Sequence, residues 1–234
     1  GSDTFMKQEP KTNFELQVSN GEKSYSTSVF YIEGKSTGFD YGYDSKMFSG
    51  VNHDFSVFTQ LITENKGKNL AIQTLPTDNT LAIPVGVTAK AGSKLTFSIK
   101  NLQLPDGLNI YLEDKNTGEF TNLSEENYTA TLNKDSNSIG QFYLYKDSKK
   151  PTSIIEPSLD NISIYNSSNN EITIVGLQTE ANIAVYSILG KEIINRNIIS
   201  NGVSKVSIPN VATGVYIVKL NSILGEVSKK VILK

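Results

Sequence analysis

The sequence predicts an all-β protein made of two β-sandwich domains, the second a small immunoglobulin-like sandwich of seven strands. Alternating stretches rich in Val, Ile, Thr, Tyr and Phe recur along the 234 residues, and such alternation is typical of strands with one buried face. Clusters of Gly, Asn, Asp and Ser separate these stretches and supply the turns that hairpins need. Long windows of helical period are lacking, so little helix is expected.

The first domain is predicted over residues 1–148. Its expected strands are short and closely spaced, which favours an antiparallel sandwich: 14–18, 26–33, 70–74, 94–100, 108–114 and 140–146. Over residues 145–157 the pattern gives way to charge, serine and two prolines, Pro151 and Pro157. This is the composition of a short, stiff linker. We place the linker at residues 149–158.

The second domain is predicted over residues 159–234. Seven alternating segments suit two small packed sheets: 161–165, 171–176, 181–187, 191–198, 203–208, 214–220 and 226–234. Gly190 is expected to take a positive φ in a tight turn. The last segment stays apolar and alternating up to Lys234, which indicates a terminus held in a sheet.

Composition narrows the classes of function. The formal net charge is −2 and no basic face is evident, which argues against nucleic acid as a partner. The absence of cysteine excludes disulfides, thiolate metal sites and a cysteine nucleophile. No apolar run approaches the roughly 18 residues of a membrane span, and no signal segment opens the sequence. The opening "GSDTF" resembles a cloning remnant, so we expect the C-terminal fragment of a longer protein.

Few residues of the first domain suggest chemistry. Asp40 and Asp44 lie on an aromatic, glycine-containing loop and are weak candidates for calcium, with turn capping as the stronger alternative. His53 has no nucleophile near it in the sequence. Glu113 and Asp114 are adjacent on a predicted strand and therefore point to opposite faces, unlike paired glycosidase acids. We expect no catalytic residue, no cofactor and no enzymatic activity.

The aromatic residues of the same loop leave an alternative open. Phe39, Tyr43 and Phe48 could stack on sugar rings, which would make the first domain a carbohydrate-binding or adhesin module of a larger surface protein or glycan-degrading enzyme. The sequence has no tryptophan, however, and Tyr and Phe also fill the cores of β-sandwiches. Burial of the three rings is therefore the expectation, and a glycan ligand is the alternative.

Three motifs occur in order near the end of the sequence: "VYSILGKEI" (185–193), "IPNVATGVYIVKL" (208–220) and "GEVSKKVILK" (225–234). Through them residues 159–234 resemble the type A C-terminal sorting domain of cargo of the type IX secretion system. The family's opening Tyr-Pro-Asn-Pro is only partly present, since Tyr165 stands here without either proline. The residues that match the family's motifs are Tyr186, Gly190, Gly214, Tyr216, Gly225, Lys229, Lys230 and Lys234.

The resemblance implies a route of export. Cargo of this family is recognised through the sorting domain by an outer-membrane translocon, and a sortase-like peptidase commonly cleaves the domain and attaches or releases the cargo. The protein is accordingly expected to be secreted or on the cell surface, with this machinery as its partner and a cut near the linker before residue 160. Residues 1–148 resemble a β-sandwich module common before such domains, which implies position rather than activity.

The strand pattern gives three expectations for the end of the chain. Gly214 should adopt a backbone conformation or a close approach that a Cβ would hinder, and Tyr216 should anchor its strand in the core. Lys229, Lys230 and Lys234 should line the exposed part of the last strand, whose unpaired edge would offer main-chain groups to a receptor. The two domains should fold independently and share a modest interface.

Overall fold

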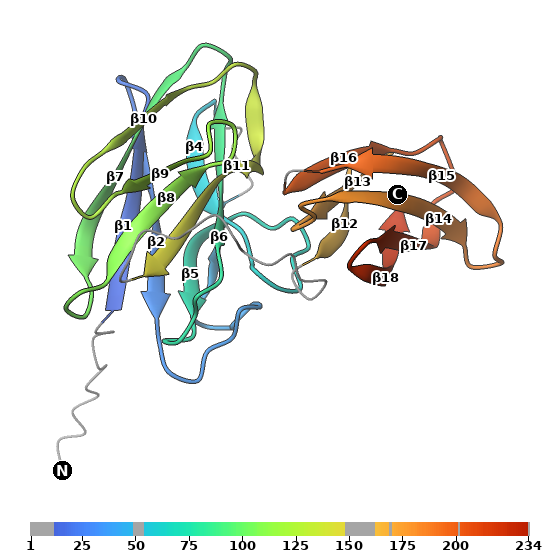
Figure 1. The fold of residues 1–234 in the computed structure, drawn as a ribbon, viewed down its shortest axis with the longest axis horizontal. Coiled ribbons are helices and arrows are strands. Elements are labelled where there is room, and N and C mark those ends of the chain that lie inside the picture. Colours follow the sequence, from blue (N-terminus) through green and yellow to red (C-terminus); the bar gives the residue numbers. More distant parts are fainter. Residues whose placement is uncertain (1–11, 49–53, 148–161, 169, 201, 234) are drawn as a thin grey trace.

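The computed structural model describes residues 12–48, 54–147, 162–168, 170–200 and 202–233. Within these ranges the chain forms strands β1 to β18 and no helix, which confirms the all-β prediction. Figure 1 shows β1 to β11 in one body, coloured blue to yellow, and β12 to β18 in a second, coloured orange to red. The predicted linker lies outside the described residues.

The strands alternate with short turns along the chain. Those of the first domain are β1 (Thr12–Ser19), β2 (Ser24–Tyr31), β3 (Ser45–Lys46), β4 (Ser56–Thr59), β5 (Leu70–Leu75), β6 (Ile83–Ala89), β7 (Lys94–Gln103), β8 (Asn109–Asp114), β9 (Glu119–Asn122), β10 (Tyr128–Thr131) and β11 (Ser136–Asp147). Those of the second domain are β12 (Ser163–Ser168), β13 (Glu171–Val175), β14 (Glu180–Ser187), β15 (Glu192–Ile199), β16 (Val203–Ser207), β17 (Gly214–Ser222) and β18 (Gly225–Leu233).

The first domain is one hydrogen-bonded sheet that closes over its own core. The strand order is β10-β7-β1-β2-β5-β4-β6-β11-β8-β9, with β3 paired to β5. Strands β4 and β5 meet through a single partnered pair, Thr59 and Leu70. Side chains from both halves of the sheet share one apolar cluster, in which the ring centroids of Phe97 and Phe142 are 4.5 Å apart. Two layers around one core make this domain a β-sandwich.

One pairing of the first domain differs from the antiparallel sandwich that the sequence predicts. Strands β2 and β5 run parallel. Parallel neighbours need a crossover rather than a hairpin, and the chain between these two strands is long enough to include β3 and β4.

The second domain is the predicted seven-stranded sandwich. A three-stranded sheet, β12-β13-β16, packs on a four-stranded sheet, β15-β14-β17-β18. Their facing side chains form a core that includes the fully buried Ile172, Ile183 and Val218. This cluster is separate from the core of the first domain. The sorting-like motifs therefore lie on a sandwich with its own core.

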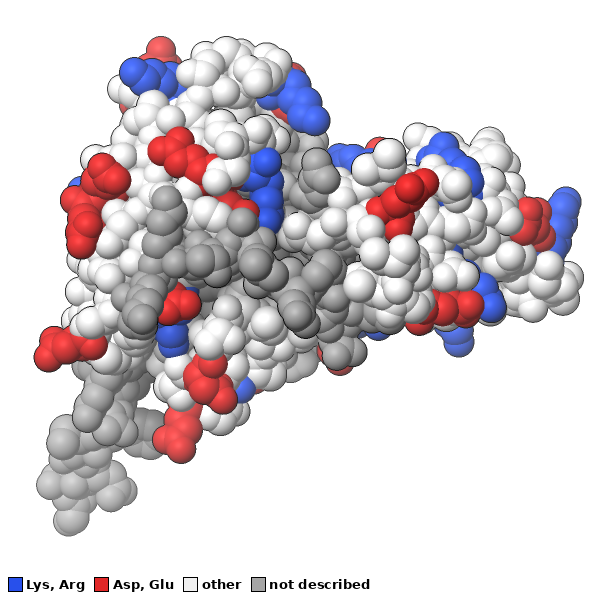
Figure 2. Space-filling model, viewed as in Figure 1, with Lys and Arg blue, Asp and Glu red and all other residues white. Residues whose placement is uncertain are grey.

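The surface carries both signs of charge. On the face drawn in Figure 2, Lys and Arg side chains are interspersed with Asp and Glu over both bodies. Among the described residues, none belongs to a helix that could cross a membrane.

Candidate functional site

The end of the chain is a hairpin, β17–β18, at the edge of the four-stranded sheet. Its register pairs Gly214 with Leu233 at the open end and Ser222 with Gly225 at the turn. Gly225 has φ +124°, a conformation that L side chains rarely adopt, so the turn favours glycine there. The hairpin is thus complete up to Leu233.

Within the described residues, strand β18 has a neighbour on one side only. The sheet order ends at β18, and its partner β17 continues to β14. At the open end the side chain of Asn166 donates a hydrogen bond from Nδ2 to the carbonyl oxygen of Ile232, at 3.0 Å. Asn166 lies on β12, so this bond joins the first strand of the sandwich to the last. Strand β12 also packs against β18, but no described strand is hydrogen-bonded to the outer edge of β18, which is what strand addition requires.

Alternation along the hairpin decides which side chains hold it in place. On β17 the buried side chains are Tyr216, Val218 and Leu220, and on β18 they are Val231 and Leu233. The Tyr216 hydroxyl donates a hydrogen bond of 2.8 Å to the carbonyl oxygen of Ala212. The prediction that Tyr216 anchors the strand in the core is confirmed.

The described lysines of the last strand lie on its exposed part, as expected, but on opposite faces of the strand. Lys229 and Lys230 are both exposed, but neighbouring residues of a strand point to opposite faces. Lys229 lies opposite the buried Val218 and Lys230 opposite Ile217. Lys229 is exposed on the inward face because β18 is the edge strand of the wider sheet. Lys234 lies outside the described residues.

The glycines of the motifs differ in what they do. Gly190 has φ +83° in the turn after β14, as predicted. The expectation for Gly214 is wrong: its φ is not in the left-handed region, and a Cβ there would meet Tyr216 Cε2 at 3.7 Å and the Ala212 oxygen at 3.9 Å, both ordinary contacts. Tyr186, before the turn, donates a hydrogen bond to Glu192 Oε2 at 3.2 Å and is half-buried.

The two aspartates of the aromatic loop cap backbone amides. Asp44 is buried, and its carboxylate accepts hydrogen bonds from the backbone N–H of Thr74 at 2.6 Å and of Asp40 at 2.8 Å. Asp40 Oδ2 accepts the backbone N–H of Ser36 at 2.8 Å. Burial raises the pKa of Asp44 despite these bonds. The described residues contain no group of three or more His, Cys, Asp or Glu placed to hold a metal ion.

The aromatic side chains of that loop are more exposed than expected. Phe39 is half-buried, but Tyr43 is 50% exposed and Phe48 is 76% exposed. Tyr41, which lies between Phe39 and Tyr43 in the sequence, is 88% exposed. The aromatic side chains that fill the core come instead from strands, for example Phe14, Phe97 and Phe142. The Lys35 ammonium lies 3.4 Å from the centroid of the Tyr43 ring, a cation–π contact that holds the ring at the surface.

The adjacent carboxylates of β8 face different surroundings, as predicted. Both are buried. Glu113 accepts hydrogen bonds from Tyr145 Oη at 2.6 Å and Lys115 Nζ at 2.7 Å. Asp114 accepts them from Tyr128 Oη at 2.9 Å and from Gln141 Nε2 at 3.0 Å. Each carboxylate is therefore satisfied by its own set of donors. His53 lies outside the described residues.

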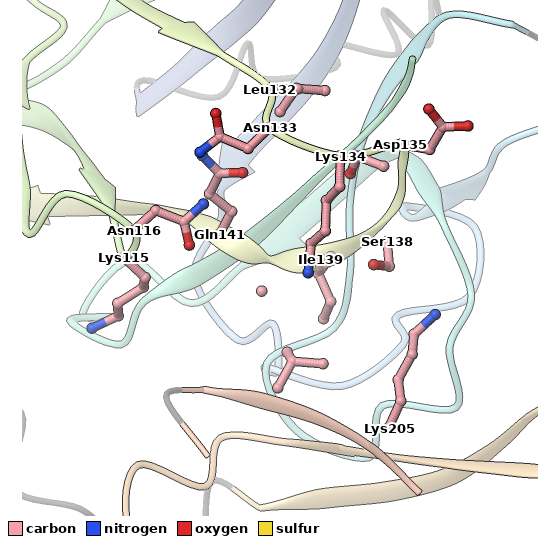
Figure 3. Close-up of a pocket in the computed structure, with 13 residues that line it drawn as sticks. Lys115, Asn116, Leu132, Asn133, Lys134, Asp135, Ser138, Ile139, Gln141 and Lys205 are labelled. Atoms are coloured by element: carbon pink, nitrogen blue, oxygen red, sulfur yellow. The ribbon is translucent and has the colours of Figure 1, made fainter. Parts of the chain in front are cut away.

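A cavity of about 710 Å³ lies where the two domains meet (Figure 3). Lys115, Lys134 and Gln141 line it from the first domain, and Lys205 of β16 lines it from the second. Two of these lysines have carboxylate partners, since Lys115 pairs with Glu113 and Lys205 lies 3.7 Å from Glu171 Oε1. Leu132, Ile139 and Val203 also line it, so the cavity is a gap of mixed polar and apolar lining between the domains.

Comparison with known proteins assigns a family to each part of the chain. Residues 3–145 match the family model described as Domain of unknown function (DUF8693). Residues 156–234 match the model described as Secretion system C-terminal sorting domain, which confirms the resemblance to type IX secretion cargo. No curated protein matches the chain.

Proposed function

This chain belongs to the family described as Domain of unknown function (DUF8693), and from that membership and its sorting domain we propose that it is a non-enzymatic part of an exported protein whose terminal hairpin is the export signal. The protein is secreted or displayed on the cell surface. Its partners are the type IX translocon and the attachment machinery that cuts near the linker before residue 160.

The observation that carries this proposal is the state of β18. The strand is held in the sheet by the buried Val231 and Leu233, yet among the described residues no strand is hydrogen-bonded to its outer edge. A receptor strand can add to such an edge through main-chain hydrogen bonds, and side chains along the edge then supply specificity. An ordered terminus is a requirement of this mode of recognition.

The motif residues have different roles in the proposed signal. Tyr216 holds the hairpin from inside, and Gly190 and Gly225 shape the turns at either end of the sheet. Lys229 and Lys230 flank the free edge on its two faces, where they also discourage aggregation with other strands. The remaining motif residues, Tyr186, Gly214 and Lys234, complete the proposed signal.

Export of a reporter tests this proposal. A reporter with a signal peptide is fused ahead of the whole chain and expressed in a bacterium that has the type IX secretion system. Lys229→Glu combined with Lys230→Glu is expected to reduce surface delivery severalfold with little change in melting temperature, because both side chains are exposed. Deletion of residues 226–234 is expected to leave the reporter in the periplasm.

The matched control places the same charge change on the first domain. Lys94 and Lys100 are exposed on β7, and their replacement by glutamate should leave delivery unchanged. Undiminished delivery of the Lys229/Lys230 variant and of the truncated chain would overturn the proposal.

The exposed aromatic loop favours glycan binding as a second candidate function, for the first domain. Tyr41 and Tyr43 just before β3 and Phe48 just after it present rings to solvent, and such rings can stack on sugars. If they do, purified chain is retarded in gels that contain the recognised polysaccharide. A variant with all three replaced by alanine should then migrate freely, whereas Tyr186→Ala should not change migration. Equal migration of wild type and triple variant in every polysaccharide tested would remove this candidate.

A further inference from the structure

We infer that the first domain carries a preformed docking surface for the sorting domain, and that the two domains remain bound to each other after the chain between them is cut. The inference rests on contacts between the domains that the export signal does not use. Its consequence for export rests on the function proposed above.

An apolar cluster crosses the domain boundary. Phe58 of β4 and Ile139 of β11 are buried in it from the first domain. The second domain supplies one side chain from each strand of its three-stranded sheet: Tyr165 of β12, Val175 of β13 and Val203 of β16. The contact therefore uses the outer face of that sheet, on the side of the sandwich away from β17 and β18.

The burial of polar residues on the same face supports this assignment. Ser163 and Thr173 pair with Val175 and Tyr165 across β12 and β13, and their exposed fractions are 6% and 3%. The outer face of an edge sheet in a free sandwich is normally solvated. Here the face is covered.

Glycines let the backbones of the two domains approach closely. A Cβ at Gly67 would lie 2.6 Å from Tyr165 Cε2, and a Cβ at Gly140 would lie 2.9 Å from Cβ and Cγ2 of Val203. The relation is reciprocal, because a Cβ at Gly202 of the second domain would lie 3.0 Å from Tyr143 Oη. A real Cβ atom rarely comes this close to another heavy atom, so a side chain at any of these three glycines would not fit between the domains unless a neighbour moved. The two surfaces are therefore complementary in shape.

A buried amide network on the first domain receives the tyrosine. Gln60 and Asn65 are 5% and 4% exposed. Gln60 Oε1 accepts a hydrogen bond from Asn65 Nδ2 at 3.0 Å and a second from Tyr165 Oη at 3.3 Å, and Asn65 Oδ1 accepts the Gly67 N–H at 2.8 Å. The network thus positions both the glycine under the ring and the acceptor for its hydroxyl. Burial raises the pKa of Tyr165 to about 12.

These contacts make cleavage and release separate events. A cut between residues 149 and 158 breaks the covalent link but none of the described contacts between the domains. The docking surface also keeps the outer face of the three-stranded sheet covered, while β18 lies in the other sheet. The first domain therefore holds the sorting domain in one orientation, and the release of the mature protein requires that this interface open.

A cleavable version of the full chain tests the inference. A protease recognition sequence replaces residues 152–156, the purified chain is cut, and the products are analysed by gel filtration at micromolar concentration. The two pieces are expected to elute together in the volume of the uncut chain. Tyr165→Ala should raise the dissociation constant of the cut pieces by about tenfold or more, because it removes the ring and the hydrogen bond to Gln60 together.

A glycine pair supplies the matched control. Gly67 and Gly34 have nearly the same backbone conformation, with φ +71° and +74°, but a Cβ at Gly34 meets nothing within 4 Å. Alanine at either position costs similar backbone strain, so only Gly67→Ala should separate the cut pieces. Separate elution of the wild-type pieces, or equal behaviour of the two glycine variants, would overturn the inference. Neither result bears on reporter export, so the two proposals fail independently.

Discussion

Tyr216→Ala is expected to lower the free energy of unfolding of the sorting domain by about 3–5 kcal/mol, since removal of a buried aromatic ring leaves a cavity that the core fills only in part. The ring is 7% exposed and packs among the buried side chains of both sheets. Urea unfolding of the whole chain measures the effect. Delivery of a reporter should fall together with stability, because the hairpin that carries the signal loses its anchor.

Two variants separate the parts of this effect. Tyr216→Phe keeps the ring and loses the hydrogen bond to the Ala212 carbonyl, and should cost about 0.5–1.5 kcal/mol. Tyr186→Ala removes a tyrosine that is half-buried on the neighbouring strand β14, and should cost clearly less than Tyr216→Ala. If the two alanine variants were equally destabilised, Tyr216 would not be the anchor.

Phe58→Ala is expected to destabilise the first domain by about 3–5 kcal/mol and to weaken the contact with the sorting domain as well. Phe58 is 1% exposed, lies opposite Gly86 on β6, and belongs to the cluster that joins the domains. Its ring occupies the space over Gly86, where a Cβ would lie 2.1 Å from Phe58 Cε2. Gly86→Ala would therefore displace the ring, at a cost of about 1–3 kcal/mol or more.

A double-mutant cycle identifies the cause. In the Phe58→Ala background the space over Gly86 is empty, so the further change Gly86→Ala should cost much less than it does alone. Residues in direct contact show such non-additivity. Additive costs, measured by urea unfolding of the four chains, would show that the ring and the glycine do not constrain each other.

Alternation in the sequence predicted most strands of the protein, but it did not find every strand that has an exposed face. All seven segments of the second domain became strands within a few residues of their expected bounds, because alternation marks a half-buried strand directly. Strands β3, β4, β6, β9 and β10 of the first domain were not predicted. Strands β3, β9 and β10 have four residues or fewer, which is too short for a distinctive alternation. Every side chain of β4 is buried, and β6 is buried at all but one position and contains Pro84 and Gly86. A strand buried on both faces shows no period of two.

The candidate site was predictable to the same extent. The burial of Tyr216 follows from alternation, and the same period of two should have placed Lys229 and Lys230 on opposite faces. The role expected of Gly214 came from its position in a motif, and the turn chemistry at that position does not require glycine. Whether Tyr43 and Phe48 are exposed depends on which other aromatic rings fill the core. The contact of Tyr165 with the first domain depends on residues far away in the sequence. Local sequence patterns therefore could not predict either feature.

The hydrogen bond between Asn166 and the carbonyl of Ile232 has a mechanical consequence. A force on the C-terminal end of the chain acts at the open end of the β17–β18 hairpin, where Gly214 and Leu233 are partners. The rungs of the ladder then carry the load one after another, so the strand peels at low force. The Asn166 bond holds Ile232, the residue next to that terminal pair, and since it starts from β12, tension at the last strand also reaches the first strand of the same sandwich through this side chain.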